Sequence, residues 1–146
     1  MDTPTPVVLV THGTVGEALK AAAEDILGPQ AALWAAGRDP EEPAAAFRNR
    51  VAALVEEATG GTGPALILAD LAGGSASSAP LPLVQARPGQ LALVAGLNLA
   101  MLLTVLIRRE EAAPLTELVA AAIEAGRDSI LDVEASLKHG QRPARH

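Results

Sequence analysis

Two alternating hydrophobic patterns limit the fold of this chain more than any other feature of its sequence. Short runs rich in apolar residues are separated by longer segments in which apolar residues recur every three or four positions, the spacing of one helix face. The expected strands are 7–10, 31–35, 64–70 and 90–96, and the expected helices are 15–26, 39–58, 73–86, 99–108 and 114–125. Apolar strands that alternate with helices indicate a parallel sheet covered on both faces. The sequence therefore predicts a doubly wound α/β domain with a mostly parallel, four-stranded sheet.

The last part of the chain departs from this alternation. Residues 128–133, "DSILDV", predict a short final strand. Residues 135–146 are polar and basic, contain no aspartate or glutamate, and are expected to be a disordered tail. Residues 1–134 are therefore expected to form one domain, which is long enough to bury a substantial core.

Two of the expected helices have unusual compositions. The helix at 73–86 should be irregular, because Pro80 and Pro82 each lack a backbone N–H. The helix at 99–107 is apolar nearly all round, and such a helix needs cover on more than one side. A partner subunit and deep burial within one chain would both supply that cover, and the pattern favours neither.

The composition excludes several classes of function. Without cysteine, the chain has no disulfide, no thiolate metal site and no cysteine nucleophile. Trp34 and Phe47 are its only aromatic residues, so it lacks the side chains that usually stack on bases or flavins. Its formal net charge of −6 repels phosphate backbones, and no nucleic-acid partner is expected.

No segment of the sequence predicts a membrane-bound protein. The opening residues, "MDTPTP", have neither the basic nor the apolar character of a secretory signal. The most apolar segment, 91–107, is interrupted by Gly96 and Asn98 and is too short for a typical membrane span. A cytoplasmic location is therefore expected, and contact with a membrane would be indirect.

A histidine follows the first expected strand, and an aspartate ends the third. His12 and Asp70 are 58 positions apart, but in the common strand order 2-1-3-4 the first and third strands flank the crevice where such sheets bind ligands. Each of the two residues is followed by glycine and a helix start, whose unpaired amides can bind an anion. The residues expected to form this anion site are Gly13, Thr14, Gly73, Gly74 and Ser75.

Phosphoryl transfer onto histidine is the chemistry that uses these groups. A carboxylate that accepts one ring N–H fixes the tautomer and leaves the other nitrogen free to attack. Asp70 would orient the ring and His12 would attack, while amides near Thr14, Gly74 and Ser75 stabilise charge on the transferred group. No metal and no cofactor is needed, and His139 and His146, in the polar tail, are expected to be solvated.

Two other functions fit the same residues. The loops at His12 and Asp70 would also suit a binding module for an anion or nucleotide, for which the FMN site of flavodoxin-like proteins is a precedent. The scarcity of aromatic residues disfavours a flavin. A purely structural or interaction protein could also keep the fold without the chemistry. A Walker-type phosphate loop is excluded, because "GTVGEALK" lacks the glycine-lysine-serine/threonine ending.

Three motifs in order along the chain resemble the mannose family of enzyme IIA proteins of the bacterial phosphoenolpyruvate-dependent sugar phosphotransferase system. They are "VTHGTVGEAL", "ILADLAGGS" and "VAGLNLAML", and the similarity extends over about 7–133. The resemblance implies that His12 takes a phosphoryl group from the phosphocarrier protein HPr and passes it to a IIB component. It also implies that Asp70 holds the ring, that Ser75 lies near the phosphate, and that a homodimer exchanges the final strand, about 129–133.

This chain departs from the family pattern around the second motif. Ala72 replaces a usual large apolar or aromatic residue, Ala76 a proline and Ser78 an asparagine, while Ala100 replaces a common proline. The histidine and aspartate are kept, but the rim that would meet a downstream partner is altered. A regulatory role, in which phosphorylation reports metabolic supply, therefore stands beside transfer to a transporter IIB.

Overall fold

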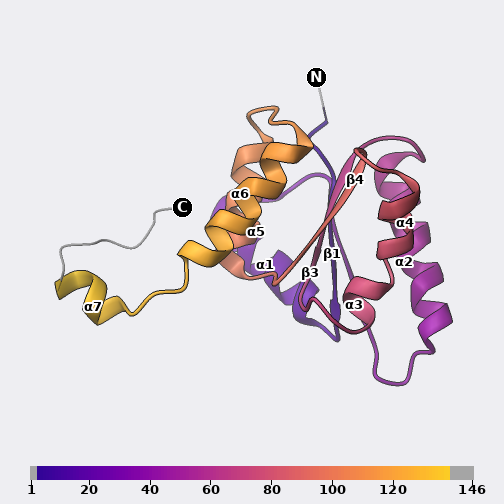
Figure 1. Cartoon of the computed structure of the whole chain (residues 1–146), viewed down its shortest axis with the longest axis horizontal. Coiled ribbons are helices and arrows are strands. Elements are labelled where there is room, and N and C mark those ends of the chain that lie inside the picture. Colours follow the sequence, from indigo (N-terminus) through magenta and orange to yellow (C-terminus); the bar gives the residue numbers. More distant parts are fainter. Residues whose placement is uncertain (1–2, 139–146) are drawn as a thin grey trace.

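A parallel four-stranded sheet forms the centre of the molecule, which a computed structural model describes for residues 3–138. Its strands are β1 (Val7–His12), β2 (Leu33–Arg38), β3 (Ala65–Ala69) and β4 (Leu91–Ala95). They lie in the order β2-β1-β3-β4, and every neighbouring pair is parallel (Figure 1). This confirms the predicted doubly wound α/β fold and places the ends of β1 and β3 side by side.

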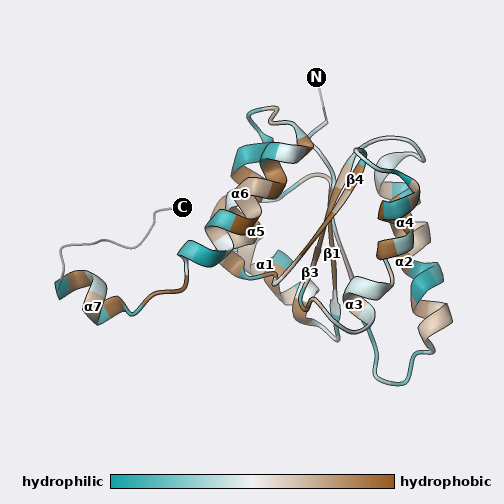
Figure 2. Cartoon of the chain, viewed as in Figure 1, coloured by the Kyte–Doolittle hydropathy of each residue, from teal (hydrophilic) through white to brown (hydrophobic). Residues whose placement is uncertain are grey.

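Helices cover both faces of the sheet. One face packs against α1 (Val15–Leu27), α5 (Leu99–Arg109) and α6 (Leu115–Asp128), and the other against α2 (Ala44–Thr59), α3 (Ser75–Ser78) and α4 (Leu81–Ala86) (Figure 1). Apolar colour concentrates on the strands, while the polar colour lies mostly on the helices (Figure 2). Among the described residues, no helix combines the length and the apolar character needed to cross a bilayer.

The core has two layers because successive residues of a strand face opposite sides of the sheet. Val7 and Leu9 of β1 join the layer beneath α5, whereas Val8 and Val10 join the layer beneath α2. All four are fully buried, as is every residue of β3. Full burial on both faces explains why these strands are continuous apolar runs.

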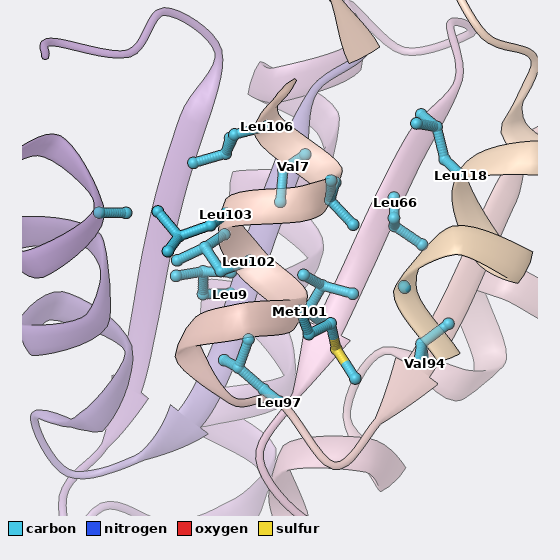
Figure 3. Packing of buried hydrophobic residues seen from close by; sticks show 14 of the residues in the cluster. Val7, Leu9, Leu66, Val94, Leu97, Met101, Leu102, Leu103, Leu106 and Leu118 are labelled. Carbon is cyan, nitrogen blue, oxygen red and sulfur yellow. The ribbon is translucent and has the colours of Figure 1, made fainter. Parts of the chain in front are cut away.

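The apolar helix α5 is covered within one chain. Leu102 and Leu106 are 0% and 1% exposed and pack with β1 and β3 residues of the same layer (Figure 3). Asn98 caps its start, as the sequence suggests, by accepting the Met101 backbone N–H at 2.9 Å. Of the two sources of cover that the pattern left open, burial within the chain accounts for most of this helix, and Ile107 remains 37% exposed.

Two boundaries differ from the prediction near β2. The strand lies at Leu33–Arg38 instead of 31–35, because its last residues pair with Thr11 and His12 at the end of β1. Helix α2 begins at Ala44 and not at Asp39, because Pro43 disfavours helical geometry in the residue before it. Residues 39–42 form a turn instead, closed by the Glu42 N–H and the Asp39 carbonyl at 3.0 Å.

The prediction of a single irregular helix at 73–86 is wrong, because the segment forms two short helices, α3 and α4. The break falls at Ala79 and Pro80. Pro80 has no N–H to donate, and its carbonyl instead accepts the N–H groups of Leu83 and Val84 as the second helix starts. Pro82 lies in the first turn of α4, where a missing donor is tolerated.

In the single chain, residues 128–133 do not form the predicted final strand, and the exchange of this segment with a partner subunit stays a prediction. Helix α6 continues to Asp128, and a last helix, α7 (Val133–Lys138), follows after four residues and lies apart from the sheet (Figure 1). A strand needs a neighbour to bond with, and this segment pairs with no strand in the part of the chain described. Asp132 instead accepts the Ala135 N–H at 3.0 Å and so starts α7. The tail predicted to be disordered from residue 135 is wrong for residues 135–138, which belong to α7. Residues 139–146, with His139 and His146, lie outside the described residues, so disorder there stays a prediction.

Candidate functional site

His12 and Asp70 meet at the carboxyl ends of the two central strands. His12 is the last residue of β1, and Asp70 follows the last residue of β3. Oδ2 of Asp70 accepts the His12 backbone N–H at 3.0 Å and contacts Nδ1 of the ring at 3.0 Å, while Oδ1 lies 3.1 Å from the same nitrogen. The His12 side chain is 46% exposed and the Asp70 side chain 14% exposed. The aspartate side chain is thus mostly shielded from solvent, while the imidazole reaches it.

The hydrogen bonds define which ring nitrogen is free. A carboxylate only accepts hydrogen bonds, so Nδ1 carries a proton, and in the neutral ring it is Nε2 that has the lone pair. Nε2 faces the second loop, since a Cβ atom placed on Gly74 would lie 3.5 Å from it. Nε2 therefore borders a glycine whose missing side chain leaves space beside the ring.

The first loop is fixed by the residues on either side of His12. Thr11 is fully buried, and its hydroxyl accepts the Gly16 N–H at 2.9 Å, which ties the first turn of α1 to β1. Gly13 has a φ of +50° and donates its N–H to the Arg38 carbonyl at 2.9 Å. Gly13 is among the residues expected to bind an anion, but its amide is already used. Thr14, exposed at the N-cap of α1, is the residue of this loop nearest the positive end of the helix dipole.

The second loop contains the remaining expected anion-binding residues. Gly73 and Gly74 are exposed, and Ser75 is half-buried at the start of α3. Gly74 has a φ of +84°, a conformation that glycine adopts without strain. The Ser77 hydroxyl donates to the Ala72 carbonyl at 2.7 Å and so closes the loop from within.

Thr11 and Ser77 support the site but escaped the sequence reasoning. Both act through backbone groups of nearby residues, and a hydroxyl beside a glycine-rich loop is a common arrangement with many other uses. The only signal for these two residues in the sequence is their position: Thr11 directly precedes His12, and Ser77 follows Gly74 by three residues.

A cleft of about 490 Å³ lies beside the first loop, between α1 and the turn after β2. Carboxylates predominate on its charged wall, from Glu17, Asp39, Glu41 and Glu42, with Arg50 as the basic side chain. Arg50 hydrogen-bonds to Glu42 and holds the pKa of that carboxyl below its usual range. The surface next to His12 is thus acidic, which suits a partner with basic side chains.

The described residues hold no group of three or more histidine, aspartate or glutamate side chains that could bind a metal ion. Neither aromatic residue flanks the His12–Asp70 pair. Phe47 is fully buried beneath the sheet, and Trp34 lies on β2 against the α2 layer. Nothing at this site therefore resembles the aromatic walls that hold a flavin ring.

The fold and the site together define a class of protein: doubly wound α/β domains in which an exposed histidine, held by a carboxylate, lies where the order of the strands reverses. A family model described as "PTS system fructose IIA component" matches residues 6–123. The chain belongs to this family, the mannose-type IIA components of the phosphotransferase system.

Known proteins agree with this assignment. The chain is 30% identical over 142 residues to the PTS system mannose-specific EIIAB component of Escherichia coli, covering 94% of this chain and 42% of that protein. It therefore spans less than half the length of this relative. The mannose/sorbose specific IIA subunit from Enterococcus faecalis has a similar structure, with a TM-score of 0.79 and 26% identity over 98% of this chain and 99% of that one.

A more distant structure supports the fold alone. The PTS IIA protein associated with the fucose utilization operon of Streptococcus pneumoniae has a TM-score of 0.81 with 20% identity, over 94% of this chain and 99% of that one. The arrangement of helices and strands is thus kept while four in five residues differ.

Proposed function

We propose that this chain is a phosphoryl carrier in which Nε2 of His12 is the acceptor atom. The observation that supports this proposal most directly is the pair of contacts from Asp70 to the backbone and ring of His12. With Nδ1–H bound to Asp70, the neutral ring has its lone pair on Nε2, which faces Gly74. The lone pair of Nε2 attacks phosphorus, a new N–P bond forms, and the bond from phosphorus to the donor breaks, with its electron pair leaving on the donor. No proton has to move on His12, because Nδ1–H stays bound to Asp70.

The two loops would bind the phosphoryl oxygens in this scheme. Thr14 lies at the N-terminus of α1, a helix of 13 residues, where the dipole favours an anion. Gly73, Gly74 and Ser75 present the second loop from the other side, and the half-buried Ser75 hydroxyl can donate to an oxygen. Donors from both sides would stabilise the charge that spreads over the equatorial oxygens during transfer.

We assign HPr as the donor and a IIB component as the acceptor, on the grounds of family membership. The acidic wall formed by Glu17, Asp39 and Glu41 supports a donor that brings basic side chains to His12. This exchange would take place in the cytoplasm. A regulatory protein is the alternative acceptor to a transporter IIB. Ala72 supports this alternative, because it is smaller than the apolar or aromatic residue usual at this position of the family.

Phosphorylation with purified components tests the proposal. The chain, incubated with phosphoenolpyruvate, enzyme I and HPr, is expected to gain a phosphate that is labile in acid and stable in base. Omitting HPr should abolish labelling, and His12→Ala should do the same in the complete mixture. Labelling that persists in His12→Ala would move the site elsewhere, and a wild-type chain that stays unlabelled would contradict the proposal.

We also propose that the chain forms a homodimer through the open edge of the sheet. A groove of about 430 Å³ runs beside the edge strand β4 and α6, with apolar walls from Leu93, Met101 and Val119. The segment after α6, residues 129–138, is here called the arm. It has exposed apolar side chains: Ile130 is 80% exposed and Leu137 61% exposed. The arm of a second copy is the occupant that would bury both surfaces at once.

The oligomeric state tests this part. Light scattering during gel filtration is expected to give twice the mass of the chain for the wild type. Ile130→Glu should shift the mass toward one chain, while Ile26→Glu, a matched change on an exposed residue of α1 (54% exposed), should leave it unchanged. A wild-type monomer at high concentration would exclude the dimer without bearing on phosphorylation.

A further inference from the structure

The end of β2 lies against the loop that follows His12. Gly37 is paired with Thr11 and Arg38 with His12 in the β1–β2 register, and the Arg38 carbonyl accepts the Gly13 N–H at 2.9 Å. The backbone of β2 therefore continues as the floor of the histidine loop, beyond the last residue of β1.

Gly37 has no room for a side chain. A Cβ atom placed there would lie 1.7 Å from the Gly13 carbonyl oxygen and 2.9 Å from the Gly13 carbonyl carbon. Gly37 is not among the glycines with a left-handed φ, so its conformation does not itself require glycine. The requirement comes from the close approach of Gly13, and any side chain at this position must displace the residue that follows His12.

Arg50 of α2 holds this end of β2 from the outside. Its Nη2 donates to the Gly37 carbonyl at 2.7 Å, and its Nε and Nη2 donate to the two carboxylate oxygens of Glu42 at 2.8 and 2.9 Å. The guanidinium also lies 5.4 Å from the ring centre of the buried Phe47. Arg38 closes the group by donating to the Glu42 carbonyl at 2.9 and 3.1 Å. Arg50 thus fixes the Gly37 carbonyl at the edge of the sheet, and Glu42 holds the Arg50 guanidinium in place.

We propose that Gly37, held by Arg50 and Glu42, is a positioning residue for the His12 imidazole. The inference rests on the proposed phosphoryl transfer at His12 for its functional meaning. Gly37 never touches the phosphoryl group; it sets the place of Gly13, and Gly13 sets the backbone from which the imidazole extends. A displacement of about 1 Å at a reacting group can slow a reaction by about 10²-fold.

Gly37→Ala is the direct test, and it is read in two ways. The ¹⁵N signals of the His12 ring are expected to move away from the values of a pure Nδ1–H tautomer, because the ring shifts relative to Asp70. The rate of phosphoryl transfer from HPr is expected to fall at least tenfold. The ring signals need no phosphoryl donor, so they report on positioning even if the phosphoryl-carrier function were wrong.

Gly63→Ala is the matched control. Its added Cβ would lie 2.9 Å from the Thr59 carbonyl oxygen, and Gly63 also lacks a left-handed φ. Gly63 precedes β3, at the end of the sheet opposite to His12. This variant is expected to lose stability while it keeps the ring signals and the transfer rate of the wild type, which separates positioning from general destabilisation.

Arg50→Met is the second test of the proposal, for use if Gly37→Ala does not fold. It adds no atom to β2. It removes the hydrogen bonds to Gly37 and Glu42 but keeps an apolar chain beside Phe47. A smaller movement of the His12 ring signals in the same direction is expected, with slower transfer. Unchanged ring signals in Gly37→Ala, or in Arg50→Met where only that variant folds, would overturn the proposal.

Discussion

Oδ2 of Asp70 accepts two hydrogen bonds from His12, one from the backbone N–H and one from Nδ1, each at 3.0 Å. A single oxygen thus fixes both the place of the residue and the direction of its ring. Movement of the carboxylate would therefore release the His12 backbone N–H and the ring Nδ1 together.

Asp70→Asn is expected to slow phosphorylation of His12 strongly while the fold remains. The asparagine amide is uncharged, and its NH₂ group, turned toward the ring, would favour the tautomer in which Nε2 carries the proton. The same change beside a catalytic histidine of serine proteases lowers the rate by about 10⁴-fold, which is an upper expectation here. Rapid-quench transfer from phosphorylated HPr measures the rate. Asp25→Asn, the same change at an exposed residue of α1, is the control, and equal rates for both variants would contradict the role of Asp70.

Gly74→Ala is expected to reduce phosphorylation at least tenfold, because its methyl group would lie 3.5 Å from Nε2, in the space that a phosphoryl group must enter. The Gly74 backbone, with φ +84° and ψ −170°, lies in a region essentially confined to glycine, so an alanine there is strained by about 1–3 kcal/mol. Gly73→Ala offers a close comparison, since its Cβ would meet nothing within 4 Å and its φ is not left-handed. Transfer kinetics and thermal unfolding of the two variants give the result. A Gly74→Ala protein as active as Gly73→Ala would mean that phosphate approaches from another side.

Thr11→Val is expected to lower the free energy of unfolding by about 1–3 kcal/mol, because it leaves the buried Gly16 N–H without its acceptor while it keeps the shape of the side chain. Thr14→Val is the matched control, because Thr14 is exposed and makes no side-chain cap hydrogen bond. Urea unfolding of the three proteins supplies the comparison. Equal losses in both variants would show that the hydroxyl of Thr11 is not what ties α1 to β1.

The order of the sheet and the meeting of His12 with Asp70 could be predicted because both depend on coarse properties. Apolar runs of strand length that alternate with helices leave few topologies, and parallel strands bring their carboxyl ends to one edge. The roles proposed for the site residues rest on the chemistry of imidazole and carboxylate in addition to this geometry.

The parts that escaped prediction depend on backbone partners that the sequence does not reveal. Residues 128–133 have a strand-like composition, but without a neighbouring strand Asp132 caps a helix there instead. Gly37 is one of 13 glycines in the sequence, and the requirement for glycine there becomes visible only from the close approach of the Gly13 carbonyl. The use of the Gly13 amide by Arg38 is likewise invisible until β2 is known to extend beyond Ala35.

Glu42 is expected to make the stability of the protein depend on pH in acid. The hydrogen bonds from Arg50 lower the pKa of Glu42 in the folded state, so its contribution is complete above the ordinary carboxyl pKa, about 4.5, and is lost as the pH falls through the lowered value. The difference in free energy of unfolding between the wild type and Glu42→Gln should therefore be constant from pH 7 to about pH 5 and should narrow below about pH 4.5. Urea titrations of both proteins between pH 7 and pH 3 measure it. A difference that stayed constant to pH 3, or that grew in acid, would show that the charge of Glu42 does not support the Arg50 network.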